Sequence, residues 1–163
     1  MRADVASRSP RGLTPDGDPV NDDRPTTALA PAKINLALVV GPLGEGGKHE
    51  VATVLQRVTL ADRISVAPAR HTKVDGYSED TLVTAALNRL ARAARHDGGW
   101  RVRIEKRIPV AAGLGGGSSD AALALRLANA QLPSPLPGAA LKDLASHIGA
   151  KRRGHCPRRP GQA

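Results

Sequence analysis

Four glycines occupy the five positions from 113 to 117, interrupted only by Leu114, and Ser118 and Ser119 follow them. Glycine loses more backbone freedom on folding than any other residue, so this cluster indicates a backbone that approaches a ligand closely or adopts positive φ angles. The alanine- and leucine-rich run that follows, residues 121–132, predicts a helix. Because a helix N-terminus presents unpaired N–H groups and a partial positive charge, the arrangement is typical of a phosphate site.

The spacing of the glycines does not fit two common phosphate loops. A Walker A loop has Gly-Lys-Ser/Thr after its glycines, and a dinucleotide-binding loop would need a third glycine at position 118, which is Ser118. A glycine hinge without a ligand is the alternative. For Ser118 and Ser119, capping of the helix and donation of a hydroxyl to phosphate or Mg²⁺ remain equally open.

Lys33 is a second candidate for chemistry, because it interrupts an otherwise apolar strand predicted over residues 29–40. Lysine is rarely buried without a partner, so its side chain lies at the strand edge or points into a polar site. Asn35 is two residues further on and therefore shares a face of the strand with Lys33.

The elements that must position these residues can be predicted from apolar periodicity. Strands are expected over 29–40, with Ile34, Leu36, Leu38 and Val40 alternating, and over 100–110, and one or two strands are expected within 51–68. Helices are expected over 78–95 (capped by Ser78), 121–132 and 137–150. The glycines then join a strand to a helix that begins near residue 119. With no Phe and a core of Ala, Val, Leu and Ile, we expect an α+β fold, a mostly antiparallel sheet with helices on one face.

Composition divides the chain into three parts. Residues 1–27 predict a disordered extension, residues 28–150 a folded domain, and residues 151–163 an aberrant basic tail with five basic residues and no acid. The single cysteine, Cys156, excludes an internal disulfide and a cysteine-based metal site. No apolar run is long enough for a membrane span and no secretory signal is present, so a cytoplasmic protein is expected. The oligomeric state is left open.

Three segments together resemble the GHMP kinases, small-molecule kinases named for galactose, homoserine, mevalonate and phosphomevalonate. The pattern Pro109-x-x-x-Gly113-Leu114-Gly115, with the glycines and serines after it, resembles their phosphate-binding motif. Residues 30–36 (APAKINL) resemble the N-terminal signature of one branch, and residues 47–62, from Gly-Lys-His-Glu to Leu-Ala-Asp, resemble its substrate-side segment. The likeness covers residues 28–150 and implies the N-terminal domain of that family, whose two-layer architecture is shared with a ribosomal protein domain.

The resemblance implies ATP and Mg²⁺ as cofactors and a small-molecule substrate. In the branch with the triple glycine and SSDAA, members phosphorylate the 2-hydroxyl of 4-diphosphocytidyl-2-C-methyl-D-erythritol in non-mevalonate isoprenoid synthesis. Lys33 would be catalytic at that hydroxyl, Asn35 would shape the substrate site, and His49 would contact the cytosine; no side chain is assigned to a metal. The ATP phosphates would lie against Pro109, Val110, Ala111, Ala112, Gly113, Leu114, Gly115, Gly116, Gly117, Ser118 and Ser119.

Two departures from the family pattern affect these expectations. Lys48 stands where the family often has an aromatic that stacks on the cytosine. After Ala150 the family continues with Asp-Val-Pro, whose aspartate is its second catalytic residue, but here Lys151 follows. A truncation or frame change after Ala150, and hence an inactive fragment, is expected. The alternative function is a nucleic-acid-binding module that uses the basic tail, against which the near absence of aromatics argues.

Overall fold

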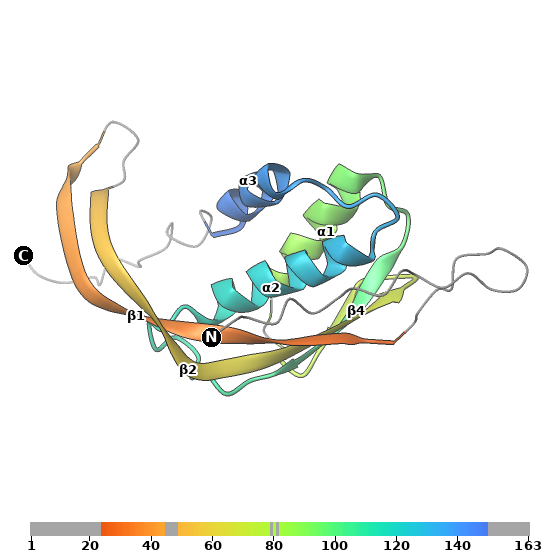
Figure 1. Cartoon of the computed structure of the whole chain (residues 1–163), viewed down its shortest axis with the longest axis horizontal. Helices are drawn as coiled ribbons and strands as arrows, with labels where there is room; N and C mark the ends of the chain where they lie inside the picture. The colour runs from red at the N-terminus through yellow and green to blue at the C-terminus, as the bar shows by residue number, and fades with distance from the viewer. Residues whose placement is uncertain (1–23, 45–48, 79, 81, 150–163) are drawn as a thin grey trace, which may run out of the picture.

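The described structure is one four-stranded sheet with helices on one face (Figure 1). It is a computed structural model that describes residues 24–44, 49–78, 80 and 82–149. In chain order the elements are β1 (Thr26–Leu43), β2 (His49–Ala69), β3 (Lys73–Asp75), α1 (Leu82–Ala94), β4 (Gly99–Glu105), α2 (Gly116–Gln131) and α3 (Gly138–Gly149).

The sheet is mostly antiparallel, as expected. Its order is β1-β2-β4-β3, with β1 antiparallel to β2, β2 antiparallel to β4, and only the short β3 parallel to β4. Helices α1 and α2 lie against the sheet, and α3 packs on those two helices. The predicted α+β fold is confirmed; β3, only three residues long, was not predicted.

The core forms where apolar alternation meets a covering helix. In β4, Trp100, Val102 and Ile104 are buried beneath the helices, while Arg101 and Arg103 are exposed on the other face. Residues at helical spacing in α1 complete this core: Val83, Ala86, Leu87 and Leu90. The alternation predicted for the strand at 100–110 is therefore confirmed up to Glu105, where β4 ends.

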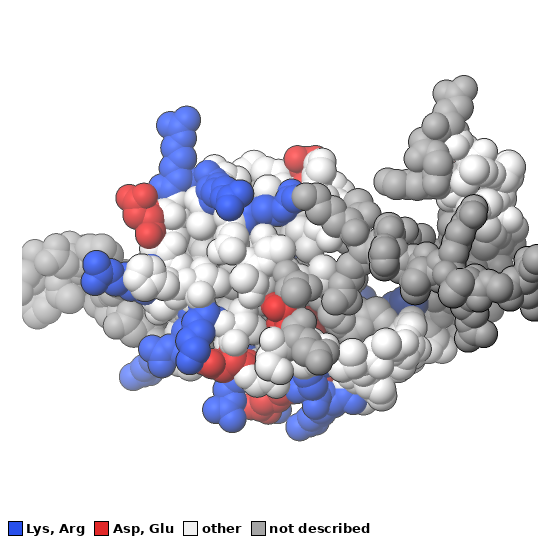
Figure 2. Space-filling view, turned by 180° about the vertical axis from the view of Figure 1, so that it is seen from behind, with Lys and Arg blue, Asp and Glu red and all other residues white. Residues whose placement is uncertain are grey.

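The sheet face away from the helices carries charges of both signs. Figure 2 shows basic and acidic side chains interspersed along the lower edge of the molecule, below the sheet. Glu105 accepts ion pairs from Arg63 and Arg103, at 3.7 and 4.0 Å. Exposed pairs of this kind contribute little stability, but they mean that this face is neither uniformly basic nor uniformly acidic.

Two predicted helix starts were wrong. Helix α1 begins at Leu82, and its first N–H groups are bound by Asp80 rather than by Ser78: the Asp80 carboxylate accepts from the N–H of Val83 at 3.1 Å and of Thr84 at 3.0 Å. Each oxygen of the Asp80 carboxylate accepts one N–H group, so one side chain binds both. Helix α2 begins at Gly116, three residues before the expected start.

The outer half of the β1–β2 hairpin leaves the body of the molecule and curves away from it (Figure 1). We call this part, Ile34–Leu43 with His49–Leu60, the arm. The predicted alternation does form a strand, but Leu36 is 62% exposed and Val39, on the other face, is 65% exposed. Register shifts near Asn35 and Val40 mark irregularities of the ladder, and such irregularities bend strands.

Two predicted segments lie largely outside the described residues. These are the extension over 1–27, of which only 24–27 are described, with Thr26 and Thr27 opening β1, and the tail over 151–163. Among the helices of the described ranges, none is long and apolar enough to cross a membrane.

Candidate phosphate-binding site

The glycine loop joins the end of β4 to the start of α2 and uses left-handed backbone at two glycines. Gly113 and Gly115 have φ angles of 74° and 73°, a region that side chains disfavour. The Gly115 carbonyl accepts the first helical hydrogen bond, from the N–H of Ser119 at 3.0 Å. The N–H groups of Gly116, Gly117 and Ser118 come before that bond and have no partner within the helix. They form the positive end of α2, which suits an anion.

The early start of α2 does not remove the loop. Residues 113–115 remain outside any helix or strand, and residues 116–118 form the first turn, whose N–H groups are the ones a phosphate would use. Neither serine caps the helix: the residue before it is Gly115, with no side-chain hydrogen bond. The Ser119 hydroxyl donates instead to the carbonyl of Pro31 at 2.8 Å, which ties α2 to β1.

The side chain of Lys33 points into a polar site at the glycine loop, the second of the two placements that the sequence left open. Its Nζ donates to the Gly113 carbonyl and to Asn35 Oδ1, each at 2.7 Å, and its backbone N–H donates to the Leu114 carbonyl at 2.9 Å. A Cβ on Gly115 would lie 3.1 Å from Lys33 Cγ, so the two chains fit closely. The structure therefore brings together Lys33, Asn35 and the loop.

His49 lies elsewhere, at the outer end of the arm. It pairs with Leu43 across the hairpin, and its Nδ1 lies 2.9 Å from the Gly41 carbonyl. Leu43 is ten residues along β1 from Lys33, roughly 30 Å of strand path at about 3.3 Å per residue. The cytosine contact of His49 stays a prediction, and Lys48 lies outside the described residues.

A buried ionic cluster lies beneath the loop and was not predicted. The Lys106 ammonium donates to Asp62 Oδ2 at 2.6 Å and to Asp120 Oδ2 at 2.9 Å. Asp62 is fully buried and Asp120 is 2% exposed. Asp62 Oδ1 also accepts from the backbone N–H groups of Arg107 and Ile108, the second at 2.8 Å. We refer to Asp62, Lys106 and Asp120 as the ionic cluster.

The ionic cluster changes the acidity of its members in opposite directions. Burial by itself would raise the pKa of Asp62, but the N–H groups of Ile108 and Arg107 and the Lys106 ammonium outweigh it and hold that pKa below 3.8. Burial raises the pKa of Asp120 to about 6, although Lys106 acts against it. For Lys106, burial is outweighed by the two carboxylates, which raise its pKa above 10.5.

Comparison with known proteins identifies the architecture around this loop. The family model described as the GHMP kinases N terminal domain matches residues 81–157, a span that contains the whole loop and α2. A crystal structure of 4-(cytidine 5'-diphospho)-2C-methyl-D-erythritol kinase superposes with a TM-score of 0.67 and 41% identity, covering 77% of this chain and 46% of that one. The chain belongs to the GHMP kinase family.

Two relatives at about 40% identity carry the same name. The 4-diphosphocytidyl-2-C-methyl-D-erythritol kinase of Rhodococcus jostii is 38% identical over 136 residues, which is 78% of this chain and 44% of that protein. The kinase of the same name from Thermus thermophilus is 44% identical over 124 residues, 75% of this chain and 44% of that protein. The chain thus spans less than half the length of these relatives. The Methanococcus jannaschii mevalonate kinase, with 11% identity and a TM-score of 0.56, supports the fold alone.

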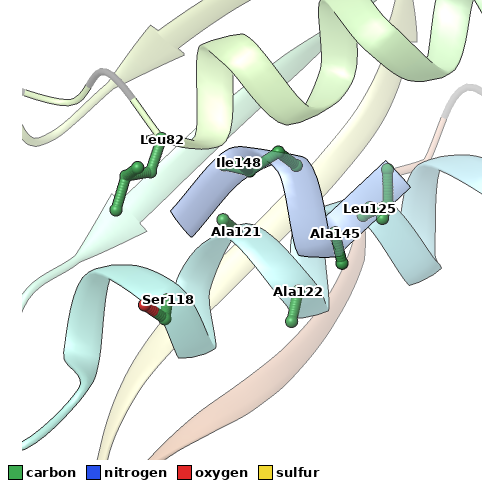
Figure 3. Close-up of a pocket in the computed structure, with 7 residues that line it drawn as sticks. All are labelled: Leu82, Ser118, Ala121, Ala122, Leu125, Ala145 and Ile148. Atoms are coloured by element: carbon green, nitrogen blue, oxygen red, sulfur yellow. The ribbon is translucent and has the colours of Figure 1, made fainter. Parts of the chain in front are cut away.

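A small cavity of about 80 Å³ adjoins the glycine loop and lies between the three helices (Figure 3). Ser118 contributes the polar side chain of its wall, and the rest of the lining is apolar. The lining residues are Leu82, Ser118, Ala121, Ala122, Leu125, Ala145 and Ile148. Among the described residues, no group of three or more His, Cys, Asp or Glu side chains could hold a metal ion.

A signal for the ionic cluster was present in the sequence. In β4 the inward positions are Trp100, Val102 and Ile104, so the next inward position is Lys106. In β2, Asp62 is in phase with the buried Ile64. Charged residues at core positions require partners of opposite sign, so Asp62 and Lys106 together predict an ion pair under the glycine loop.

Proposed function

We propose that this chain holds the phosphates of ATP at the glycine loop and forms part of the active site of a small-molecule kinase. The observation that carries the proposal is the bond from Lys33 Nζ to the Gly113 carbonyl. This bond places a cation beside the first turn of α2, whose N–H groups have no partner within the helix. The match to each of the relatives named above covers only 44% of that relative, so the activity is proposed for the site to which this chain contributes.

Phosphoryl transfer requires positioning and stabilisation of charge more than covalent chemistry by the protein. The N–H groups of Gly116, Gly117 and Ser118 would bind phosphate oxygens, and Mg²⁺ would arrive with ATP and neutralise part of their charge. Lys33 would orient the acceptor hydroxyl and stabilise negative charge on the transferred group. Asn35 holds Lys33 in place, and Thr53 in turn holds Asn35 at 2.7 Å.

The substrate that we propose is 4-diphosphocytidyl-2-C-methyl-D-erythritol, phosphorylated on its 2-hydroxyl. The names of the relatives that share about 40% of residues with this chain support it, and so does the position of Asn35 beside Lys33. We also propose that the reaction takes place in the cytoplasm. The nucleic-acid alternative gains no support from the open sheet face, whose charges are mixed and paired.

Titration of the 163-residue chain with MgATP, followed by NMR of its backbone amides, tests the phosphate site. We expect saturable shifts confined to residues 113–119 and their neighbours. Gly115→Ala should abolish them, because the left-handed φ of 73° disfavours a side chain. Gly138→Ala is the matched control, since Gly138 has open space around its Cβ position and no positive φ. Binding that Gly115→Ala leaves unchanged would contradict the site.

A second assay tests the substrate. ADP release is measured with 4-diphosphocytidyl-2-C-methyl-D-erythritol, the product is identified by mass, and Lys33→Ala is compared with the native chain. No turnover by the native chain is the result expected of an inactive fragment. Turnover that is lost in Lys33→Ala would overturn that expectation and support the role of Lys33, whereas turnover that survives in Lys33→Ala would assign the step to another group. RNA retained on the chain at high salt would favour the nucleic-acid alternative instead, because phosphate-backbone binding weakens steeply with salt.

A further inference from the structure

Lys106 lies where the two ends of the glycine loop meet. It directly follows β4, and its ammonium bonds to Asp62 on β2 and to Asp120 on α2. Residues of β2 and α2 and the end of β4 therefore converge on one nitrogen atom.

The first end of the loop is held through Asp62. One carboxylate oxygen of Asp62 takes the Lys106 ammonium, and the other accepts the N–H groups of Arg107 and Ile108, the first two residues after Lys106. The path of the backbone as it leaves β4 is thus fixed by a carboxylate that is itself fully buried.

The second end of the loop is held through Asp120. This residue lies in the second turn of α2, and its bond to Lys106 ties the helix start to the end of β4. The fit is close: a Cβ on Gly116 would lie 3.3 Å from Lys106 Nζ and 3.0 Å from Ile108 Cγ2. Gly116, the first residue of α2, therefore packs against the same Lys106 ammonium that bonds to Asp62 at the other end of the loop.

The ionic cluster is not arranged for maximal stability. Asp120 Oδ1 is buried and has no hydrogen-bond partner among the described residues. A buried, unpaired polar atom costs free energy, and buried ion pairs are often replaceable by apolar groups without loss of stability. What such a cluster can provide is one defined arrangement of the backbone around it.

We infer that Lys106, held between Asp62 and Asp120, is a positioning residue that keeps the glycine loop in its phosphate-binding form before nucleotide binds. This inference rests on the proposed function, because it assigns a purpose to the order of the loop. Lys106 acts through the backbone of the loop and is given no contact with ATP. The N–H groups of the first turn of α2 are then already directed at the site, and binding need not order them.

Hydrogen–deuterium exchange of the full chain without nucleotide tests this inference. The variants are Asp120→Ala, which leaves a balanced Lys106–Asp62 pair, and Lys106→Met. We expect exchange in peptides from 107–119 to become about tenfold faster, a local opening, while peptides from β2 and α1 keep their rates. For Asp120→Ala the urea midpoint should change little, because one carboxylate oxygen was unpaired. Lys106→Arg, which keeps the charge, should restore part of the protection.

Asp80→Ala is the matched control, an aspartate removed from the start of the other sheet-packed helix. Asp80 binds the N–H groups of Val83 and Thr84, so its loss should loosen the start of α1 and leave the loop unchanged. A merely structural cluster would behave differently: exchange would accelerate equally across the domain, or not at all in 107–119. Either result overturns the inference, as does failure of both Asp120→Ala and Lys106→Met to fold. If only Lys106→Met fails to fold, Asp120→Ala decides.

The nucleotide readout separates this inference from the proposed function. MgATP affinity, measured by calorimetry, should fall in Asp120→Ala by the factor by which the competent fraction of the loop falls, about tenfold where that fraction drops to a tenth. If the native chain binds no ATP, the proposed function fails, yet the exchange rates still show whether Lys106 orders the loop. If the loop loses all its protection in Asp120→Ala and ATP affinity is unchanged, the positioning role is wrong.

Discussion

The two halves of the β1–β2 hairpin share their strands but differ in what covers them. At its base, Ala30 and Ala32 are fully buried under α2. In the arm, Leu36 and Val39 are more than half exposed, although the apolar residues are larger and as regularly spaced. Apolar alternation therefore specifies that a strand forms, but burial depends on a covering element that comes much later in the chain. Within the described residues, that element reaches only the base.

The halves differ in their polar contacts as well. The base is tied to distant elements, through Lys33 to the loop and through Ser119 to Pro31. In the arm the side-chain bonds are local: Asn35 donates to Thr53, which donates to the Ala37 carbonyl, both at 2.7 Å. The base thus belongs to a three-dimensional network that includes the glycine loop, and the arm joins this network at Asn35, which accepts from Lys33. Beyond Asn35 the arm depends on its own ladder.

The largest expected effect compares one substitution in the core beneath the helices and in the arm. Leu90→Ala removes a side chain that is fully buried in the core, which costs about 2–5 kcal/mol. Leu38→Ala removes the same atoms from an exposed position in the arm and should cost within about 0.5 kcal/mol. Urea denaturation gives both free energies of unfolding. A cost for Leu38→Ala close to that of Leu90→Ala would show that the arm is packed in solution.

The second effect compares the pH dependence of the buried cluster with that of the rest of the chain. The pKa of Asp120 is raised to about 6, so its ionised form opposes folding above pH 6, and protonation relieves this as the pH falls toward 4. The pKa of Asp62 is lowered, so its contribution is present above pH 4 and is lost below that value.

The difference between the native chain and Asp120→Asn isolates the first of these contributions. Between pH 7 and pH 4 the native chain should gain about 1–3 kcal/mol relative to Asp120→Asn. Denaturation at a series of pH values measures it, and the carboxylates outside the ionic cluster cancel in the difference. A difference that does not vary with pH would mean that Asp120 is ionised throughout this range.

Much of this site could be predicted from the sequence, and the reasons for the failures are physical. The glycines of the loop were predicted because their cost in backbone freedom needs a local geometric reason, and Gly113 and Gly115 have the positive φ angles that supply it. The start of α2 was missed because no side chain caps it; a left-handed glycine does. The partners of Lys33 and Lys106 lie 80 and 44 residues away in the sequence, at Gly113 and Asp62, and no local pattern reports such distances. Phase in the strand did indicate that Lys106 points inward, but only the fold shows to what.

The third effect compares glycines in the loop and in the arm. Gly115→Ala forces a side chain into left-handed backbone and against Lys33 Cγ, and should cost about 1–2 kcal/mol. Gly113→Ala has the same φ problem but open space, so its cost should lie at the lower end of that range. Gly41→Ala in the arm has no positive φ; its Cβ would meet Glu50 Cβ at 3.3 Å. We expect that change to stay within about 0.5 kcal/mol. Equal costs at Gly115 and Gly41 would show that the loop backbone is not constrained.

The smallest effect on stability concerns the arm itself. Val39 and Val40 are 65% and 57% exposed and, as neighbours in a strand, point to opposite faces. Val39→Thr with Val40→Thr keeps the shape and strand preference of both residues, so the free energy of unfolding should change by less than about 0.5 kcal/mol. Self-association at high concentration should nevertheless fall, because exposed apolar surface drives it and β1 is an edge strand of the sheet that the described residues form. Light scattering over a concentration series measures association. The pair Val39→Ile with Val40→Ile is the control, because it changes the same two positions and keeps them apolar. Association that persists unchanged in the threonine variant would mean that the chain associates through the body of the domain rather than through the arm.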